Sequence, residues 1–175
     1  MRNSVYIAVS IDGFIATEDG GIDWLMNVPN PDKSDFGYNK FMKSIDAVVM
    51  GRNTFEKVLT FGKWPYKKPV FVLSNSLKKF QDELKGKVEI LNGTPVEITK
   101  KLNSEGFNNL YIDGGKVVQE FLKYELVDEL IISQIPVLLG SGIPLFGKTD
   151  NLQNFKLLET KIYNKTIVKT HYRKI

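Results

Sequence analysis

Cysteine is absent from this sequence of 175 residues, which excludes disulfide bonds, thiolate metal ligands and a cysteine nucleophile. Histidine occurs once, as His171, and one imidazole is too few for a multi-histidine zinc site. No apolar run approaches the ~20 residues of a membrane-spanning helix, and the residues after Met1 lack the apolar region of a signal peptide. We therefore expect a cytoplasmic protein that binds no metal ion and enters no membrane.

Charge of one sign does not dominate either. The 24 basic and 20 acidic side chains leave a formal net charge of +4 and are spread along the chain. This even distribution suits a small anionic ligand and argues against a nucleic-acid partner, which would favour a basic stripe. The basic and aromatic residues 63–68 favour nucleic-acid stacking only weakly. The composition, 42 % hydrophobic and 25 % charged, is typical of a globular protein, so we expect residues 1–175 to form a single domain.

The most informative stretch is residues 47–56, in which an apolar run meets a glycine and then a helical pattern. Residues 47–50 predict a buried strand, Gly51 a sharp turn, and Asn53 or Thr54 the cap of the helix that follows. The first N–H groups of a helix carry partial positive charge and bind phosphate, and Arg52 adds a forked cation there. The alternative is an ordinary strand-to-helix connection with a solvated Arg52.

The remaining pattern alternates strands with helices and ends in a hairpin, which predicts an α/β fold with a mixed sheet. Thr94 to Glu97 form a capping box with Pro95 at the first helical position, and Gly106 is a helix stop. Ser34 is expected to cap a helix that reaches Ser44. The predicted strands cover residues 4–10, 47–50, 69–74, 88–91, 110–113, 129–135, 155–163 and 166–173.

Two further strand ends carry small or polar residues. Asp113 is followed by Gly114 and Gly115, which open a helical pattern, and Leu73 is followed by Ser74 and Asn75. Ligands of open α/β sheets bind at the carboxyl ends of the strands. Three such ends side by side would hold an extended phosphorylated ligand of the size of a dinucleotide. The Rossmann glycine fingerprint is missing after the first strand, so a Rossmann fold is disfavoured.

The hexapeptide from Gly51 to Glu56 resembles the phosphate-binding motif of the dihydrofolate reductase superfamily, which includes the reductase (C-terminal) domain of riboflavin biosynthesis. Four other segments support the resemblance in the same order along the chain: residues 10–16, 73–74, 112–115 and 129–133. The resemblance implies a mixed, mostly parallel eight-stranded sheet flanked by helices, with a C-terminal antiparallel hairpin. It also implies hydride transfer from NADPH, with the protein supplying position and electrostatics.

The resemblance further implies a set of cofactor-binding residues. Arg52 would pair with the 2′-phosphate and so favour NADPH over NADH, while Asn53 and Thr54 would hold phosphate groups. Leu73, Ser74 and Asn75 would lie by the adenosine end. The nicotinamide and pyrophosphate would contact Ala8, Ile15, Ala16, Gly51, Gly114, Gly115, Lys116 and Val117. For Ala8 and Ile15, packing in the core is an equally good explanation.

On the substrate side, Asp35 precedes Gly51 by the spacing of the buried acid in bacterial folate reductases. The resemblance therefore makes Asp35 the candidate catalytic group, with a pKa raised by an apolar pocket and with Ser133 as its supporting hydroxyl. Asp35 is alternatively an acid that stabilises the start of a helix. Trp24 and Phe36 could stack on a flat heterocycle or pack in the core.

The sequence thus predicts an NADPH-dependent reductase of a pyrimidine- or pterin-like substrate, similar to 5-amino-6-(5-phosphoribosylamino)uracil reductase. Two alternatives stay open: a dihydrofolate reductase-type activity, and a cofactor-binding module without turnover. The helix that carries histidine and arginine in riboflavin-pathway reductases has Tyr38, Asn39 and Lys40 here, which changes the expected grip on a phosphoribosyl group. The apolar residues 137–139 and 143–146 belong either to the core or to a dimer surface, and the resemblance to the riboflavin reductases implies a homodimer.

Overall fold

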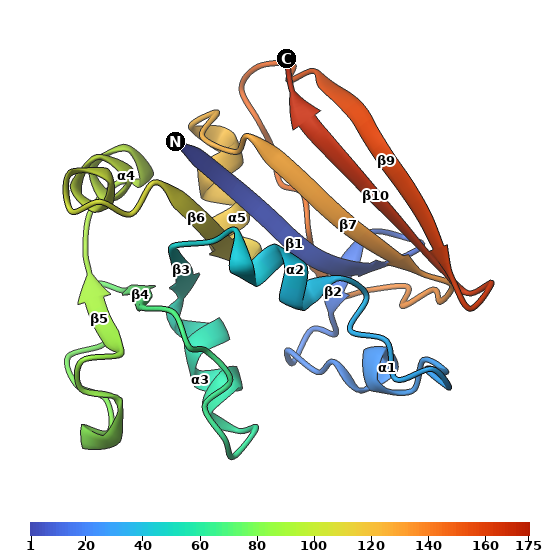
Figure 1. Cartoon of the computed structure of the whole chain (residues 1–175), viewed down its shortest axis with the longest axis horizontal. Helices are drawn as coiled ribbons and strands as arrows, with labels where there is room; N and C mark the ends of the chain where they lie inside the picture. Colours follow the sequence, from blue (N-terminus) through green and yellow to red (C-terminus); the bar gives the residue numbers. More distant parts are fainter.

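The computed structural model describes all 175 residues, and its main feature is an eight-stranded sheet with helices on both faces (Figure 1). The strands are β1 (Arg2–Ser10), β2 (Phe14–Ala16), β3 (Ala47–Gly51), β4 (Val70–Leu73), β5 (Val88–Leu91), β6 (Asn109–Asp113), β7 (Glu129–Ile135), β8 (Ile143–Pro144), β9 (Phe155–Tyr163) and β10 (Ile167–Lys174). The helices are α1 (Asp23–Met26), α2 (Tyr38–Lys43), α3 (Arg52–Leu59), the 3-10 helix η1 (Asp82–Leu84), α4 (Pro95–Ser104) and α5 (Gly115–Lys123). None of these helices combines the length and the apolar character needed to cross a bilayer.

The strand order is β5-β4-β3-β6-β1-β7-β10-β9, and all neighbours pair in parallel except β10, which is antiparallel to β7 and to β9. This confirms the predicted dihydrofolate reductase-like sheet and its closing hairpin, which turns through Asn164 and Lys165, both at positive φ. The strands β6, β1 and β3 occupy the middle of the sheet. Their carboxyl ends therefore open onto one central edge, where ligands of such sheets bind.

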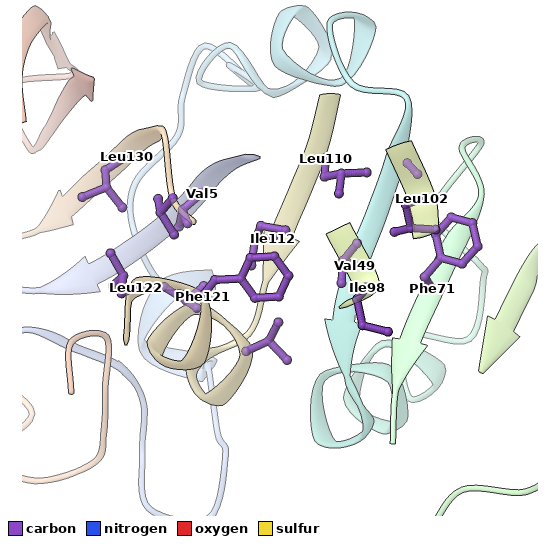
Figure 2. Packing of buried hydrophobic residues seen from close by; sticks show 14 of the residues in the cluster. Val5, Val49, Phe71, Ile98, Leu102, Leu110, Ile112, Phe121, Leu122 and Leu130 are labelled. Carbon is purple, nitrogen blue, oxygen red and sulfur yellow. The ribbon is translucent and has the colours of Figure 1, made fainter. Parts of the chain in front are cut away.

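The two faces of the sheet bury separate hydrophobic clusters. On one face, α4 and α5 pack Leu102 and Phe121 against strand residues such as Val5 and Ile112, all of them essentially inaccessible (Figure 2). On the other face, Phe41 of α2 and residues of α3 pack against β3, β4 and the ring of Tyr111. The parallel part of the sheet is thus a buried layer between helices, as expected for parallel strands, whereas β9 is exposed along most of its length.

Helix α4 begins with the predicted capping box. The Thr94 hydroxyl accepts the N–H of Glu97, and the Glu97 carboxylate accepts the N–H of Thr94. The helix ends at Ser104, and Gly106 adopts φ +92 beyond it, so the predicted stop is also confirmed.

Replacing Thr94 by Ala removes one half of this box and leaves the N–H of Glu97 without its partner. We expect the free energy of unfolding to fall by about 1 kcal/mol, which lowers the melting temperature by about 2–4 °C in a chain of this size. Thermal unfolding followed by circular dichroism measures the change. Val96→Ala, which trims an exposed side chain in the same turn, is the matched control and should not lower the melting temperature.

Helix α2 is shorter than predicted. Phe36 and Gly37 adopt positive φ (+53 and +90), so helical geometry starts only at Tyr38. The prediction that Ser34 caps this helix is wrong, because its hydroxyl accepts the N–H of Phe36, two residues on, in a local turn. The short helix α1 and the two-strand ladder of β2 with β8 were not predicted.

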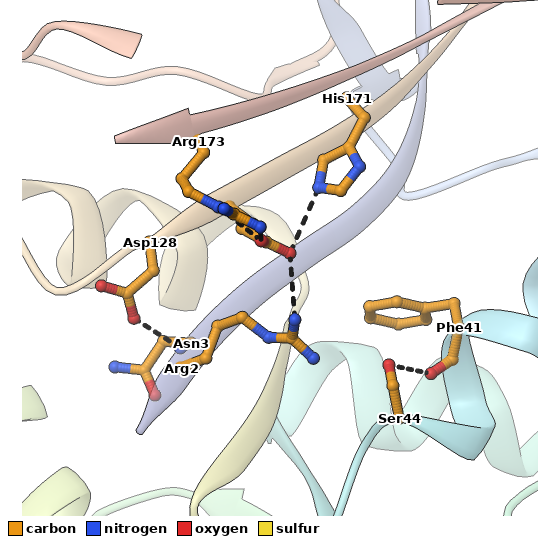
Figure 3. A network of polar contacts seen from close by, with 8 residues as sticks. Arg2, Asn3, Phe41, Ser44, Asp128, His171 and Arg173 are labelled. Carbon is orange, nitrogen blue, oxygen red and sulfur yellow. Dashed lines mark hydrogen bonds and ion pairs between the residues drawn. The ribbon is translucent and has the colours of Figure 1, made fainter. Parts of the chain in front are cut away.

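At the edge of the sheet that carries the amino ends of the parallel strands, Glu129 is buried with three cationic or titratable partners. Arg173 donates from Nε and Nη2 to Oε1 at 3.0 and 2.9 Å, and His171 Nε2 lies 3.2 Å from Oε2. Arg2 Nη1 lies 3.7 Å from Oε2, and Figure 3 shows these side chains converging from β1 and β10. A buried carboxylate is costly unless it is paired in this way, so the cluster fixes β10 against β7 and β1.

The connection from β7 to β9, residues 136–154, divides between core and surface. Leu145 is fully buried in the cluster under α5, whereas Leu138 and Phe146 are 72 % and 50 % exposed. The segment is therefore core in part. The use of its exposed side chains by a second copy stays a prediction.

Candidate active site

Helix α3 presents an uncapped N-terminus at the carboxyl end of β3. The prediction that Asn53 or Thr54 caps it is wrong: the helix begins at Arg52, directly after Gly51, and no side chain accepts its first N–H groups. These N–H groups are free to bind an anion, and the helix dipole favours negative charge there. The structure thus leaves this end more open than the sequence suggested.

Helix α5 presents a second uncapped N-terminus, and it touches the first. Gly114 precedes α5 with φ +87 and ψ +140, and no side chain caps the helix. A β-carbon placed on Gly114 would lie 3.1 Å from Thr54 Cβ and would overlap the Thr54 hydroxyl. A β-carbon on Gly51 would lie 3.1 Å from Val117 Cγ2. Glycine at both positions lets the two helix ends meet, and the result is a cradle of free N–H groups of the kind that holds a pyrophosphate.

The loop after β1 closes the cradle from the other side. A β-carbon on Gly115 would lie 2.9 Å from Ile15 Cδ1, so Ile15 already fills that space. The Asp12 carboxylate holds the loop: it accepts the N–H of Gly140 at 2.8 Å, that of Leu139 and the Ser10 hydroxyl. These hydrogen bonds, that of Ser10 most of all, keep the pKa of Asp12 below its ordinary value. Asp12 thus has a positioning role that sequence reasoning did not give it.

At the other end of the cradle lies Arg52. Its Nη1 donates to Ser76 Oγ at 3.0 Å, and its Nε donates to Glu56 Oε1 at 2.6 Å. Ser74 Oγ accepts the N–H groups of Ser76 and Leu77, which turns the loop after β4 toward Arg52. Arg52 and the hydroxyl groups of Ser74 and Ser76 are therefore gathered beside the N-terminus of α3.

The structure brings most of the predicted cofactor residues to one edge of the sheet. Gly51 and Leu73 are register partners at the ends of β3 and β4, and Ala8 is paired with Ser133. Lys116 and Asn75 are exposed at the rim, and Ile15 and Ala16 belong to the small ladder of β2 and β8. The residues joined by direct proximity are Gly51, Thr54, Gly114, Gly115, Val117 and Ile15.

Asp113 is the titratable group nearest the centre of this edge, and the sequence analysis gave it no role. It ends β6 immediately before Gly114 and is partly buried, and Tyr66 donates its hydroxyl to Oδ2 at 3.3 Å. Burial raises the pKa of Asp113 above its ordinary value near 3.8, while hydrogen bonds from Tyr111, Gly114 and Tyr66 act in the opposite direction. The sequence did contain a sign of this role: Asp113 stands at the end of a predicted strand and directly before two glycines.

Asp35 does not lie in the expected apolar pocket. It is exposed, and its two carboxylate oxygens accept the N–H groups of Gly37 and Asn39, both at 2.9 Å. These hydrogen bonds, with that of Asn39 first, lower the pKa of Asp35 instead of raising it. The expected environment of a catalytic acid is therefore wrong, and the alternative of an acid at a helix start describes Asp35. Ser133 is buried on β7 and makes no hydrogen bond to it.

The segment before α2 is hydrogen-bonded to the sheet through one atom, the carbonyl oxygen of Phe36. It accepts hydrogen bonds from Tyr6 OH at 2.8 Å, Lys169 Nζ at 2.7 Å and Tyr163 OH at 3.1 Å. The ammonium of Lys169 also lies over the rings of Tyr6 and Tyr163. Phe36 therefore contributes its backbone here, and its ring packs edge-on against Tyr163.

Trp24, the other residue expected to meet a substrate, lies on α1 and is partly buried. Its indole Nε1 is inaccessible to solvent and has no hydrogen-bond acceptor within the chain. A buried donor without a partner is uncommon in folded proteins.

The sequence matches one family model over nearly its whole length. The model describes the RibD C-terminal domain and matches residues 4–169. The chain belongs to the RibD C-terminal domain family. The matched residues include most of the eight-stranded sheet and the N-termini of α3 and α5.

Individual proteins resemble this RibD C-terminal domain over their full length. The uncharacterized protein YwjB of Bacillus subtilis (strain 168) is 42 % identical over 98 % of this chain and 97 % of its own length. The crystal structure of a putative riboflavin biosynthesis protein from Shewanella sp. PV-4 is 44 % identical and superposes with a TM-score of 0.96, covering 100 % of this chain and 99 % of that one. Dihydrofolate reductase from Enterococcus faecalis, solved with NADP(H), shares the fold at 20 % identity, with a TM-score of 0.67 over 99 % of this chain and 96 % of that one.

Proposed function

We propose that this chain is an NADPH-dependent reductase that delivers hydride to a flat, pyrimidine- or pterin-like substrate. The observation that carries the proposal is the contact between Gly114 and Thr54, which joins two uncapped helix N-termini at the centre of the sheet. That arrangement offers two sets of free N–H groups to two adjacent phosphates. The dihydrofolate reductase that shares the fold was solved with NADP(H), which supports the same class of ligand here.

The residues present fit a nicotinamide dinucleotide phosphate. The pyrophosphate would lie between the N-termini of α3 and α5, against the backbone of Gly114 and Gly115. Arg52 and the hydroxyl of Ser76 would take the 2′-phosphate, because a guanidinium and a hydroxyl are matched donors for phosphate oxygens. The nicotinamide would lie toward Ala8 and Ile15. The bound cofactor supplies the hydride, and the chain supplies position, charge and protons.

We assign the proton to Asp113 rather than to Asp35. A carboxyl whose pKa is raised by burial retains its proton to higher pH and can donate it to a ring nitrogen or a carbonyl oxygen. Tyr66, which donates to Oδ2, orients the carboxyl. A dihydrofolate reductase-type activity is the second candidate. It ranks lower because the acid expected before α2 is exposed and has a lowered pKa.

Fluorescence titration of the purified protein with NADPH and NADH tests the first half of the proposal, with Trp24 and Trp64 as reporters. Saturable quenching by NADPH followed by NADPH oxidation with an aminouracil or a pterin would support a reductase. Tight binding without oxidation in the presence of either class would favour a cofactor-binding module. Absence of binding to both cofactors would refute the proposal.

Replacing Arg52 by Ala is expected to weaken NADPH binding by about 10- to 100-fold and to change NADH binding little. The estimate follows from about 1.5–3 kcal/mol for a charge-assisted hydrogen bond, with 1.4 kcal/mol per tenfold in affinity. The same fluorescence titration measures both constants.

Lys101→Ala is the matched control, because Lys101 also forms an exposed ion pair of 2.6 Å with a glutamate four residues on, far from the cradle. It should leave both affinities unchanged. Equal losses of NADPH and NADH affinity in the Arg52 variant would contradict the assignment of the 2′-phosphate to Arg52.

A further inference from the structure

Arg52, which the proposed function assigns to the 2′-phosphate, already forms an ion pair with Glu56. Arg52 Nε donates to Glu56 Oε1 at 2.6 Å, one helical turn along α3, and both side chains are 46 % exposed. The second hydrogen bond of Arg52 goes to Ser76 Oγ, on the loop that the proposed function places at the adenosine ribose. The Glu56 carboxylate is thus hydrogen-bonded to the Arg52 guanidinium, which the proposed function assigns to the negatively charged 2′-phosphate.

The two nicotinamide cofactors differ in what they present to that acid. NADPH presents a phosphate monoester with about −1.5 to −2 charges at neutral pH, which a neighbouring carboxylate repels. NADH presents a ribose 2′-hydroxyl, which is a hydrogen-bond donor and for which a carboxylate is the usual acceptor. Arg52 and Glu56 therefore favour opposite cofactors.

The surroundings of Glu56 give its side chain a second position. Glu56 and Lys79 line the same open pocket, of about 350 Å³, together with Gln81 and with apolar side chains of α3 and of the segment before η1. If Glu56 leaves Arg52, its carboxylate can turn into this open pocket, which Lys79 also lines. When the Glu56 carboxylate leaves Arg52, its negative charge is therefore not buried without a partner.

We propose that Glu56 sets the cofactor preference of this chain. It accepts the ribose hydroxyl of NADH while it stays on Arg52, and it turns toward Lys79 when a 2′-phosphate takes its place. The preference for NADPH is consequently smaller than Arg52 alone would give, and both cofactors are used. This inference rests on the proposed function, since it requires the adenosine end of a nicotinamide cofactor at Arg52.

The test compares Glu56→Gln with the wild-type chain by calorimetric titration of NADPH, NADH, 2′,5′-ADP and 5′-AMP. We expect the variant to bind NADPH and 2′,5′-ADP more tightly by up to about fivefold, the upper end of the range measured for exposed ion pairs, and to bind NADH more weakly. Glu105→Gln breaks the equivalent exposed pair with Lys101 on α4 and should change none of the four constants.

Lys79→Gln tests the second position of Glu56. It should weaken NADPH binding in the wild-type background and have no effect when combined with Glu56→Gln. An equal loss in both backgrounds would mean that Lys79 contacts the phosphate itself, and it would overturn the movement of Glu56.

The outcomes separate this inference from the proposed function. Tight NADPH binding by the wild type with an unchanged NADPH-to-NADH ratio in Glu56→Gln would overturn the role of Glu56 and leave the reductase proposal intact. A wild-type chain that binds neither cofactor would overturn both. Binding of 2′,5′-ADP with no discrimination from 5′-AMP would place the ribose away from Arg52 and would also overturn the inference.

Discussion

Asp113→Asn is expected to lower the rate of NADPH oxidation with an accepted substrate by about 10²- to 10⁴-fold, the usual range for loss of a general acid. NADPH affinity should be unchanged, because the side chain faces the Tyr66 and Tyr111 side of the sheet and the cradle is made of backbone. The amide keeps the size of the carboxyl and an oxygen that can accept from Tyr66. What it loses is the transferable proton. Steady-state kinetics and the NADPH titration measure the two quantities separately.

The pH dependence gives this prediction a sign. The pKa of Asp113 is raised, so the acid form persists above pH 3.8, and wild-type kcat/KM should fall as pH rises through the raised pKa. The raised pKa also makes the free energy of unfolding depend on pH. The stabilisation that comes from the protonated Asp113 is present at low pH and is lost as pH rises through the raised pKa. At neutral pH the Asn variant should therefore be at least as stable as the wild type. A carboxyl resonance in a ¹³C NMR titration reports the pKa without any substrate.

Two variants sharpen the test. Asp35→Asn removes the carboxylate that chain spacing had suggested and should leave turnover within a few-fold of wild type. Tyr66→Phe removes a hydrogen bond that lowers the pKa of Asp113, so the fall of kcat/KM should move to higher pH. Full activity of Asp113→Asn, or a larger loss in Asp35→Asn, would return the role of acid to Asp35.

The second large effect is expected from Gly114→Ala, which should abolish NADPH binding and lower the melting temperature by several degrees. The new β-carbon would overlap the Thr54 hydroxyl and approach Thr54 Cβ to 3.1 Å, so α3 and α5 must move apart. Overpacking costs about 1–3 kcal/mol, and a non-glycine residue held at φ +87 costs about 1–3 kcal/mol more. Fluorescence titration and thermal unfolding measure the two consequences.

Gly106→Ala isolates the backbone contribution. Gly106 also adopts positive φ (+92), but a β-carbon there would meet nothing within 4 Å. This variant should lose stability and keep its NADPH affinity. If Gly114→Ala binds NADPH as tightly as Gly106→Ala, the contact between the two helix ends does not form the cofactor site.

Local chemistry predicted much of this fold. The capping box at Thr94, the short valine-rich run before Gly51 and the hairpin through Asn164 and Lys165 each have one dominant conformation, and the structure contains all three. The pairing of β2 with β8 could not be foreseen, because strands of three and two residues leave no periodic pattern. The loops that carry them are joined by Asp12, which accepts the N–H groups of Leu139 and Gly140, 127 and 128 residues away.

The error at Asp35 has a similar cause. Spacing along the chain assumes that the intervening residues form regular structure, but Phe36 and Gly37 both take positive φ and rotate Asp35 out to solvent. Sequence propensity gives little reason for a phenylalanine to adopt that conformation. It is held there by contacts from β1, β9 and β10, which only the folded chain supplies. Asp113, by contrast, was within reach of sequence reasoning, since it ends a central strand.

The Phe36 carbonyl has a further consequence for how the region before α2 behaves. A carbonyl oxygen has two lone pairs, and this one is offered three donors. Withdrawing any single donor therefore leaves the oxygen with two hydrogen bonds, one for each lone pair. The attachment is redundant, so it survives the loss of one strand's contribution. If Lys169 withdraws, its ammonium gives up its hydrogen bond to Phe36 and keeps the contacts with the rings of Tyr6 and Tyr163.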